Sequence, residues 1–159
     1  MRNEAQYCTC IVKSFNERGD LAWKIPDSSG NWATSIRVFD IMGRQDNKPM
    51  YLEAKFNKDP SAFNLNRIEE HQAYYLDEFA KIPDAYCYVA LGVQWGRGDC
   101  RSFIFDWRDL SALYKKGFSI HKKELEKLPY NPVKKEIFQL DNIINRETLI
   151  SIYGENLYD

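Results

Sequence analysis

A glutamate and a lysine stand two residues apart in the segment "MYLEAK", residues 50–55. The segment has the character of a β-strand, in which residues i and i+2 point to the same face. Glu53 and Lys55 therefore project together, while Leu52 and Ala54 point the other way, toward a core. Two opposite charges on one face either carry chemistry or form an exposed ion pair, which contributes little to stability.

A second carboxylate comes from the preceding apolar run, "SIRVFDIM" at residues 35–42. This run is predicted to form a hairpin with the Glu53 strand across the turn-rich "GRQDNK", and such a hairpin lets Asp40 lie beside Glu53. Two carboxylates suit Mg²⁺, a hard cation that takes oxygen ligands, and the backbone carbonyl of Ala54 offers another. With Lys55 beside the metal, the cluster indicates phosphodiester hydrolysis.

A glutamine on a predicted helix supports this hypothesis. The segment 64–82 is expected to be helical because apolar residues recur at steps of three or four, at Leu65, Ile68, Leu76 and Phe79. Gln72 falls on the same stripe and should face the sheet, where a buried amide needs hydrogen-bond partners. His71 lies off the stripe, and local bonding or solvent exposure is the better interpretation of it.

The motifs Phe39-Asp40, Glu53-Ala54-Lys55 and "IEEHQ" ending at Gln72 resemble those of the PD-(D/E)XK nuclease superfamily, specifically the RecU-type Holliday junction resolvases. The resemblance implies that Asp40 and Glu53 are metal ligands, that Lys55 is the catalytic lysine and that Gln72 supports the site. Such enzymes use Mg²⁺, which Mn²⁺ can replace, to cut four-way DNA junctions as homodimers. Phe39 replaces the proline that names the superfamily, and the segment before Asp40 is short for the projecting stalk of RecU enzymes.

The predicted elements follow the core order αβββαββ. Helices are expected at residues 3–18 and 64–82, and strands at residues 21–25, 35–42, 49–56, 85–95 and 101–107. Together with the resemblance, this order predicts an α/β, restriction-endonuclease-like fold with a mixed sheet flanked by helices. The chain is expected to be one domain, with a core of about residues 1–107 and a small helical C-terminal elaboration at about 108–159.

Composition leaves the partner open. The chain has 159 residues, 44% of them hydrophobic, and a net charge of -1, so DNA contacts must come from local basic surface. Candidates for contacts to DNA phosphates are Arg37, Arg44 and Lys58, which should flank the site, and Lys122 and Lys123 in a lysine-rich later segment. No base-reading motif is visible, which favours recognition of DNA shape over recognition of a long base sequence. The lysine-rich segment is equally well explained as the solvated face of small helices.

Several further residues allow two interpretations. Glu4 lies on the inward stripe of the first helix with Cys8 and could join the metal site, but a first-turn glutamate is also favoured by the helix dipole. Ser28 and Ser29 are better explained by a turn than by phosphate binding.

The four cysteines lack zinc-site spacing and are expected to be reduced and structural. Without a signal sequence or a membrane-spanning run, we expect a cytoplasmic protein with no membrane contact. Two alternatives to the junction resolvase remain: a restriction-type or phage nuclease of the same fold, and a nucleic-acid-binding module that does not cut.

Overall fold

The computed structural model describes residues 1–26 and 37–159, so Ser28 and Ser29 lie outside the described part. Its elements are α1 (Glu4–Glu17), β1 (Leu21–Lys24), β2 (Ile41–Gln45), β3 (Lys48–Asn57), β4 (Phe63–Asn64), the 3₁₀ helix η1 (Leu65–Arg67), α2 (Glu70–Ala80), β5 (Tyr86–Gly96), β6 (Asp99–Asp106), α3 (Trp107–Lys115), β7 (Ser119–Ile120), α4 (Lys122–Leu125), β8 (Asn131–Val133), α5 (Arg146–Tyr153) and the 3₁₀ helix η2 (Glu155–Tyr158).

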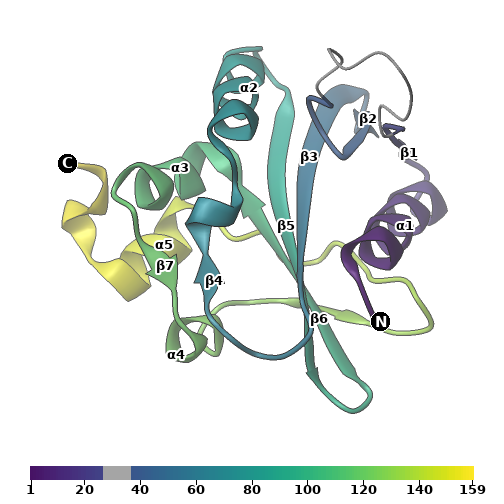
Figure 1. The fold of residues 1–159 in the computed structure, drawn as a ribbon. Coiled ribbons are helices and arrows are strands. Elements are labelled where there is room, and N and C mark those ends of the chain that lie inside the picture. Colours follow the sequence, from purple (N-terminus) through teal and green to yellow (C-terminus); the bar gives the residue numbers. More distant parts are fainter. Residues whose placement is uncertain (27–36) are drawn as a thin grey trace, which may run out of the picture.

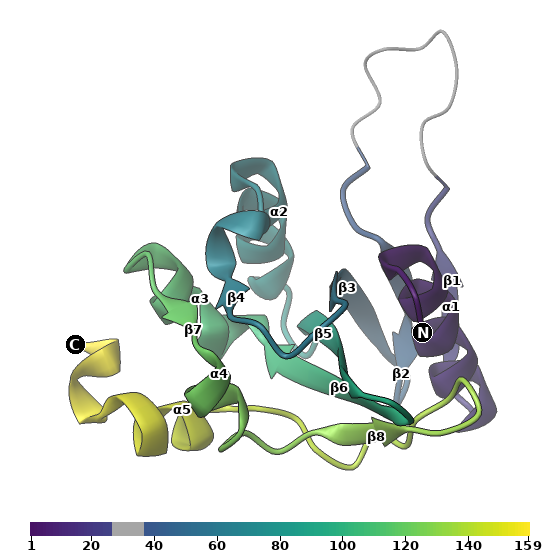
Figure 2. The same ribbon diagram turned by 60° about the horizontal axis from the view of Figure 1, so that its bottom comes forward.

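The central sheet has the strand order β1-β2-β3-β5-β6-β8. Its β3–β5 pair is parallel and its other pairs are antiparallel, while β4 pairs with β7 in a separate ribbon. In Figures 1 and 2, α1 covers one face of the sheet, and α2 and α3 lie on the other. The predicted α/β class, a mixed sheet flanked by helices with the core order αβββαββ, is therefore confirmed.

Side chains of β3 alternate between two hydrophobic cores, one on each face of the sheet. Leu52 and Ala54 pack in the core beneath α1, together with Tyr7. Tyr51 belongs to the opposite core, which includes Leu76 of α2. The predicted alternation is thus correct, and it directs Glu53 and Lys55 toward α2.

The β2–β3 hairpin differs from the prediction at its turn and at the start of its first strand. Only Asp46 and Asn47 form the turn, with φ of 51° and 63°, and pairing begins at Gln45 with Lys48. Two consecutive positive φ values are typical of a type I′ hairpin turn, which matches strand twist and which Asp and Asn tolerate. The strand consequently includes part of the predicted turn, and Asp40 lies just before it.

The helix predicted at residues 64–82 begins later than expected. Its first residues form β4 and η1, and the Asn64 side chain accepts a hydrogen bond from the Asn66 backbone N–H. An Asn in this position competes with helix for the backbone donors, which explains the local turn. Helix α2 starts only after Glu69, although Leu65 and Ile68 are buried as predicted.

The C-terminal elaboration is only partly helical. Helices α3, α4 and α5 agree with the prediction, but β8 joins the main sheet beside β6, and β7 pairs with β4. Asn131 in β8 is buried and donates to the backbone carbonyls of Ser102 and Asn142 at 3.3 and 2.9 Å. These partners are distant from Asn131 in the sequence, so local periodicity could not predict strand β8.

All four cysteines are free and buried, as predicted. Burial raises the pKa of the Cys8 and Cys10 thiols to about 12, which keeps them protonated and unreactive at neutral pH. None of the helices in the described part of the chain has the length and apolar character needed to cross a membrane.

Gly92 sets how closely α1 packs on β5. A Cβ at Gly92 would come within 2.8 Å of the Tyr7 ring and 2.9 Å of the Phe56 ring, and both rings are buried. We expect Gly92→Ala to lower the free energy of unfolding by about 1–3 kcal/mol through overpacking. Gly96→Ala is the control, because no described atom lies within 4 Å of that Cβ. Equal urea-denaturation midpoints for the two variants would contradict this packing.

Candidate active site

Asp40 is held at the point where the β2–β3 ladder ends. The last pair of the ladder is Ile41 with Leu52, so Asp40 follows in register opposite Glu53. The Asp40 Oδ2 atom accepts a hydrogen bond of 2.8 Å from the Ala54 backbone N–H. An aspartate side chain thus takes the place of a strand partner, and no described strand pairs with this edge of β3 beyond Leu52. We call residues 53–57 on this side the open edge of β3.

Glu53, Lys55 and Gln72 form one hydrogen-bonded group on the α2 side of the sheet. Gln72 Nε2 donates to Glu53 Oε1 at 2.6 Å, and Lys55 Nζ lies 3.3 Å from the same oxygen. Lys55 Nζ also lies 3.3 Å from Gln72 Oε1. The structure therefore brings together the residues predicted from the sequence, and Gln72 finds the partners that its inward position requires.

The start of α2 fixes the orientation of Gln72. Its Oε1 accepts a hydrogen bond of 2.9 Å from the backbone N–H of Glu69, the N-cap residue. This contact is half of a capping box, so the residue that caps the start of the helix also holds the site. His71 bonds locally, with Nδ1 3.2 Å from Glu69 Oε2, as the sequence indicated.

The charged groups of this site are almost inaccessible. Exposed fractions are 3% for Asp40, 2% for Glu53 and 8% for Lys55. The pKa of Glu53 is raised to about 9, first because burial penalises the charged form and then because Asp40 lies nearby and is hydrogen-bonded to it; Lys55 opposes the shift. Two buried carboxylates thus share a site that favours an added positive charge.

Cations and one further carboxylate surround these residues. Arg37 forms an ion pair of 2.7 Å with Asp40 Oδ1. Glu4, at the start of α1, interacts electrostatically with Lys55 and Asp40, and burial raises its pKa. Within residues 1–26 and 37–159, however, no three His, Cys, Asp or Glu side chains are grouped to hold a metal ion. Glu4 therefore lies near the site without completing a three-carboxylate cluster.

The donors present fit Mg²⁺, which commonly takes one or two carboxylates and keeps water in its other positions. Asp40 and Glu53 supply the carboxylates. In a β-strand the N–H and C=O of one residue point toward the same neighbour. Because the Ala54 N–H donates to Asp40, the Ala54 carbonyl also faces the open edge and offers a third oxygen. Burial and the neighbouring Asp40 raise the pKa of Glu53, so a bound cation would favour its charged form.

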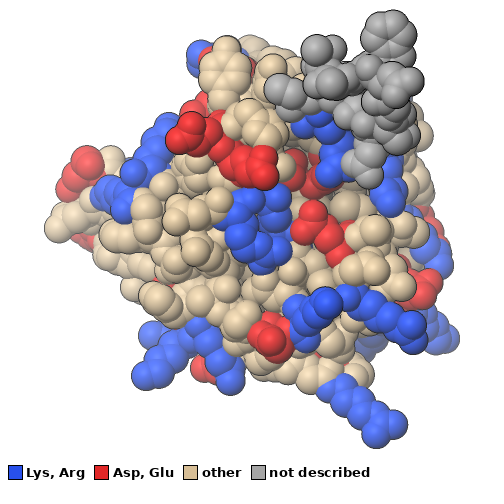
Figure 3. Space-filling view, viewed as in Figure 1, with Lys and Arg blue, Asp and Glu red and all other residues tan. Residues whose placement is uncertain are grey.

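The predicted DNA contacts are scattered. Arg44 does not flank the site as predicted, because it pairs with Pro49 near the far end of β2, roughly 13 Å along the strand from Asp40. Lys58 is exposed just after β3, and Lys122 and Lys123 are exposed on α4. Figure 3 shows basic and acidic groups interspersed on the face drawn, with no continuous basic band.

Sequence reasoning missed Arg67, in η1. Its Nη2 donates to the Phe56 backbone carbonyl at 3.0 Å, its Nη1 donates to Asn57 Oδ1, and its guanidinium lies 3.9 Å from the Glu4 carboxylate. Arg67 thus contacts the same open edge as Asp40. The prediction of one continuous helix at 64–82 gave no indication of this contact, because a residue of such a helix was not expected to point toward the end of β3.

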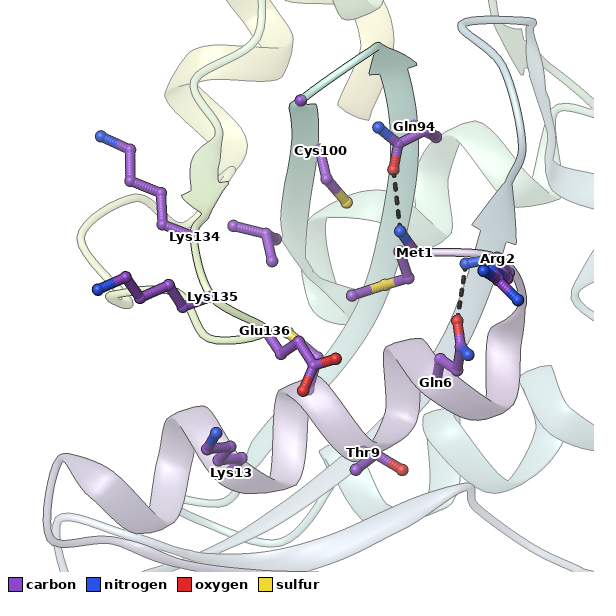
Figure 4. A pocket seen from close by; sticks show the side chains of 13 residues that line it. Met1, Arg2, Gln6, Thr9, Lys13, Gln94, Cys100, Lys134, Lys135 and Glu136 are labelled. Carbon is purple, nitrogen blue, oxygen red and sulfur yellow. Dashed lines mark hydrogen bonds between the residues drawn. The ribbon is translucent and has the colours of Figure 1, made fainter.

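A cavity of about 680 Å³ lies apart from this group, between α1, the β5–β6 hairpin and the turn after β8. Cys10, Cys100 and Val133 line it, with lysines at its rim. Figure 4 shows Gln94 and Gln6 hydrogen-bonded to the first two residues of the chain there. The lining includes none of the predicted catalytic residues, so this cavity is not the candidate active site.

No protein-family model matches the sequence, and no curated protein matches it. Among solved structures, the chain is similar to Hjc, a Holliday junction resolvase from the archaeal hyperthermophile Archaeoglobus fulgidus. The identity is 19% and the TM-score is 0.44, over 62% of this chain and 74% of that chain. A likeness of this degree identifies neither a family nor an activity, and the case for function rests on the site itself.

Glu53→Gln should stabilise the metal-free protein increasingly as pH rises. Below the ordinary glutamate pKa both the folded and the unfolded state hold the proton, and no difference arises. As pH rises from about 4.5 to about 9, the unfolded state ionises first, so wild type loses stability that the variant keeps. We expect the variant to gain about 1–4 kcal/mol at pH 9 relative to pH 5. Urea unfolding in EDTA measures this, with exposed Glu126→Gln as the control. A difference independent of pH would contradict the shift.

Proposed function

We propose that this protein is a Mg²⁺-dependent DNA endonuclease that hydrolyses phosphodiester bonds, with Asp40, Glu53, Lys55 and Gln72 as its active-site residues. The observation that carries the proposal is the buried group in which Glu53 lies between Asp40, Lys55 and Gln72. The resemblance of the sequence motifs to PD-(D/E)XK nucleases supports the same reaction.

Burial of these charges argues against a purely structural role. Taking a carboxylate or an ammonium out of water costs several kcal/mol, and well-packed apolar residues of similar size would often stabilise the fold better. A site in which Glu53 has a strongly raised pKa inside the sheet is typical of a functional site. A DNA-binding module that does not cut would not need a buried group of charged side chains.

Each residue has a distinct task in this proposal. Asp40, Glu53 and the Ala54 carbonyl would hold Mg²⁺, which supplies Lewis-acid charge and lowers the pKa of a bound water. Lys55 Nζ, near Glu53, is placed to donate to a phosphate oxygen and to balance the charge that develops there. Gln72 keeps both of these side chains in place from the first turn of α2.

Branched DNA is the substrate that we propose, and the sequence resemblance to RecU-type resolvases supports it. Cutting two opposing strands of a four-way junction requires two active sites related by symmetry, and the proposed assembly is a homodimer. A restriction-type or phage nuclease that acts on linear duplex is the alternative within the same chemistry.

Cleavage of labelled four-way junctions, linear duplex and single strands, each with Mg²⁺, Mn²⁺ or EDTA, tests this function. Wild type should nick junctions symmetrically in Mg²⁺ or Mn²⁺ and not in EDTA. Asp40→Asn, Glu53→Gln and Lys55→Ala should each lower the rate at least about 100-fold, because each removes a charge that acts in the transition state. Gln72→Ala should lower it about 10- to 100-fold, since Gln72 acts by orienting the others.

Glu126→Gln, which changes an exposed carboxylate at the C-terminal end of α4, is the matched control and should leave the rate unchanged. Failure of wild type to cut any of the substrates with either metal would overturn the catalytic proposal. Cutting that survives Lys55→Ala would mean that the active site lies elsewhere. Preference for linear duplex over junctions would favour the restriction-type alternative.

A further inference from the structure

We propose that Arg67 binds a backbone phosphate next to the one that is cut, so that a DNA strand lies along the open edge of β3. This inference rests on the proposed nuclease function and deepens it by naming how the strand is positioned. Its basis is the placement of the guanidinium on the same strand edge as the candidate metal ligands, together with the donors that remain on it.

The first step concerns position. The Phe56 carbonyl, which accepts from Arg67, belongs to the residue two places after Ala54, and alternate residues of a strand point their backbone groups the same way. Arg67 therefore lies along the open edge about 7 Å from the Ala54 carbonyl. Lys55, beside Glu53, is near the proposed reacting phosphate, and Arg67 is one step further along the strand.

The second step concerns chemistry. A guanidinium has five N–H donors in a planar fork. Two contacts, to Asn57 Oδ1 and the Phe56 carbonyl, hold the Arg67 fork in place. Its other donors have no hydrogen-bond acceptor among residues 1–26 and 37–159, and a phosphate suits them because it can accept two parallel hydrogen bonds.

The third step concerns access. The Arg67 side chain is 36% exposed and that of Glu4 is 41% exposed, in contrast to the buried Lys55. At 3.9 Å, Glu4 is too far away for a hydrogen bond and balances the charge of Arg67 only loosely. A phosphate can therefore replace Glu4 as the partner of Arg67 at small cost, because exposed ion pairs contribute little.

The experiment measures DNA binding in the Lys55→Ala background, where cutting is suppressed, as a function of salt concentration. Each phosphate contact contributes about 0.7–0.9 to the slope of log affinity against log salt. Arg67→Ala should lower the slope by about this amount and weaken binding about tenfold. Arg67→Lys should keep the slope and recover part of the affinity, because it keeps the charge but loses the fork.

Two control variants separate phosphate binding from a structural role. Asn57→Ala removes a contact that holds Arg67 but leaves its charge, so the slope should stay at the parent value. Lys81→Ala removes an exposed charge at the far end of α2 and should also leave the slope unchanged. Arg67→Ala with an unchanged slope, or Asn57→Ala with the same loss of slope as Arg67→Ala, would overturn the inference. Thermal unfolding of each variant checks that the fold is kept.

The outcomes also distinguish the two proposals. If wild type cuts DNA and Arg67→Ala keeps its slope, only the role of Arg67 fails. If the protein binds DNA with an Arg67-dependent slope but wild type never cuts, the phosphate contact stands and the catalytic proposal fails. If wild type neither binds nor cuts DNA, both fail.

Discussion

The hydrogen bond from the Ala54 backbone N–H to the Asp40 side chain is the contact on which the site depends. The β2 strand is too short to pair with all of β3, so the second half of β3 would otherwise present unpaired backbone groups on this side. An unpaired strand edge is normally covered or blunted. Here an aspartate takes up one donor and, by doing so, brings its own carboxylate next to Glu53.

The side chains of β3 alternate between a face that packs in a core and a face that carries candidate active-site residues. Leu52 and Ala54 anchor the strand in the core beneath α1, while Glu53 and Lys55 lie on the face toward α2. Because the strand is central and packed on both sides, its charged residues are held with little freedom. Rigid positioning of this kind is what electrostatic stabilisation of a transition state requires.

The first turn of helix α2 is hydrogen-bonded to the site on β3. Gln72 accepts from the Glu69 backbone and donates to Glu53, so the contact that starts the helix also orients the carboxylate. The segment before the helix, which forms η1 instead of extending α2, turns Arg67 back to the end of β3. The open edge is thereby lined from three separate parts of the chain: Asp40 before β2, Arg67 after β3 and Glu4 at the start of α1.

The sequence by itself determined the β3 alternation, the αβββαββ order and the inward position of Gln72, because each follows from a local period of two or of three to four residues. It could not determine where β2 ends, where α2 starts or that β8 joins the sheet, since these depend on a two-residue turn, an Asn64 side-chain contact and long-range contacts of Asn131. For Glu4 the sequence left two interpretations open, and only the tertiary structure placed Arg67 at the open edge and Arg44 away from it. Such placements depend on which distant segments pack together, and no local pattern records that.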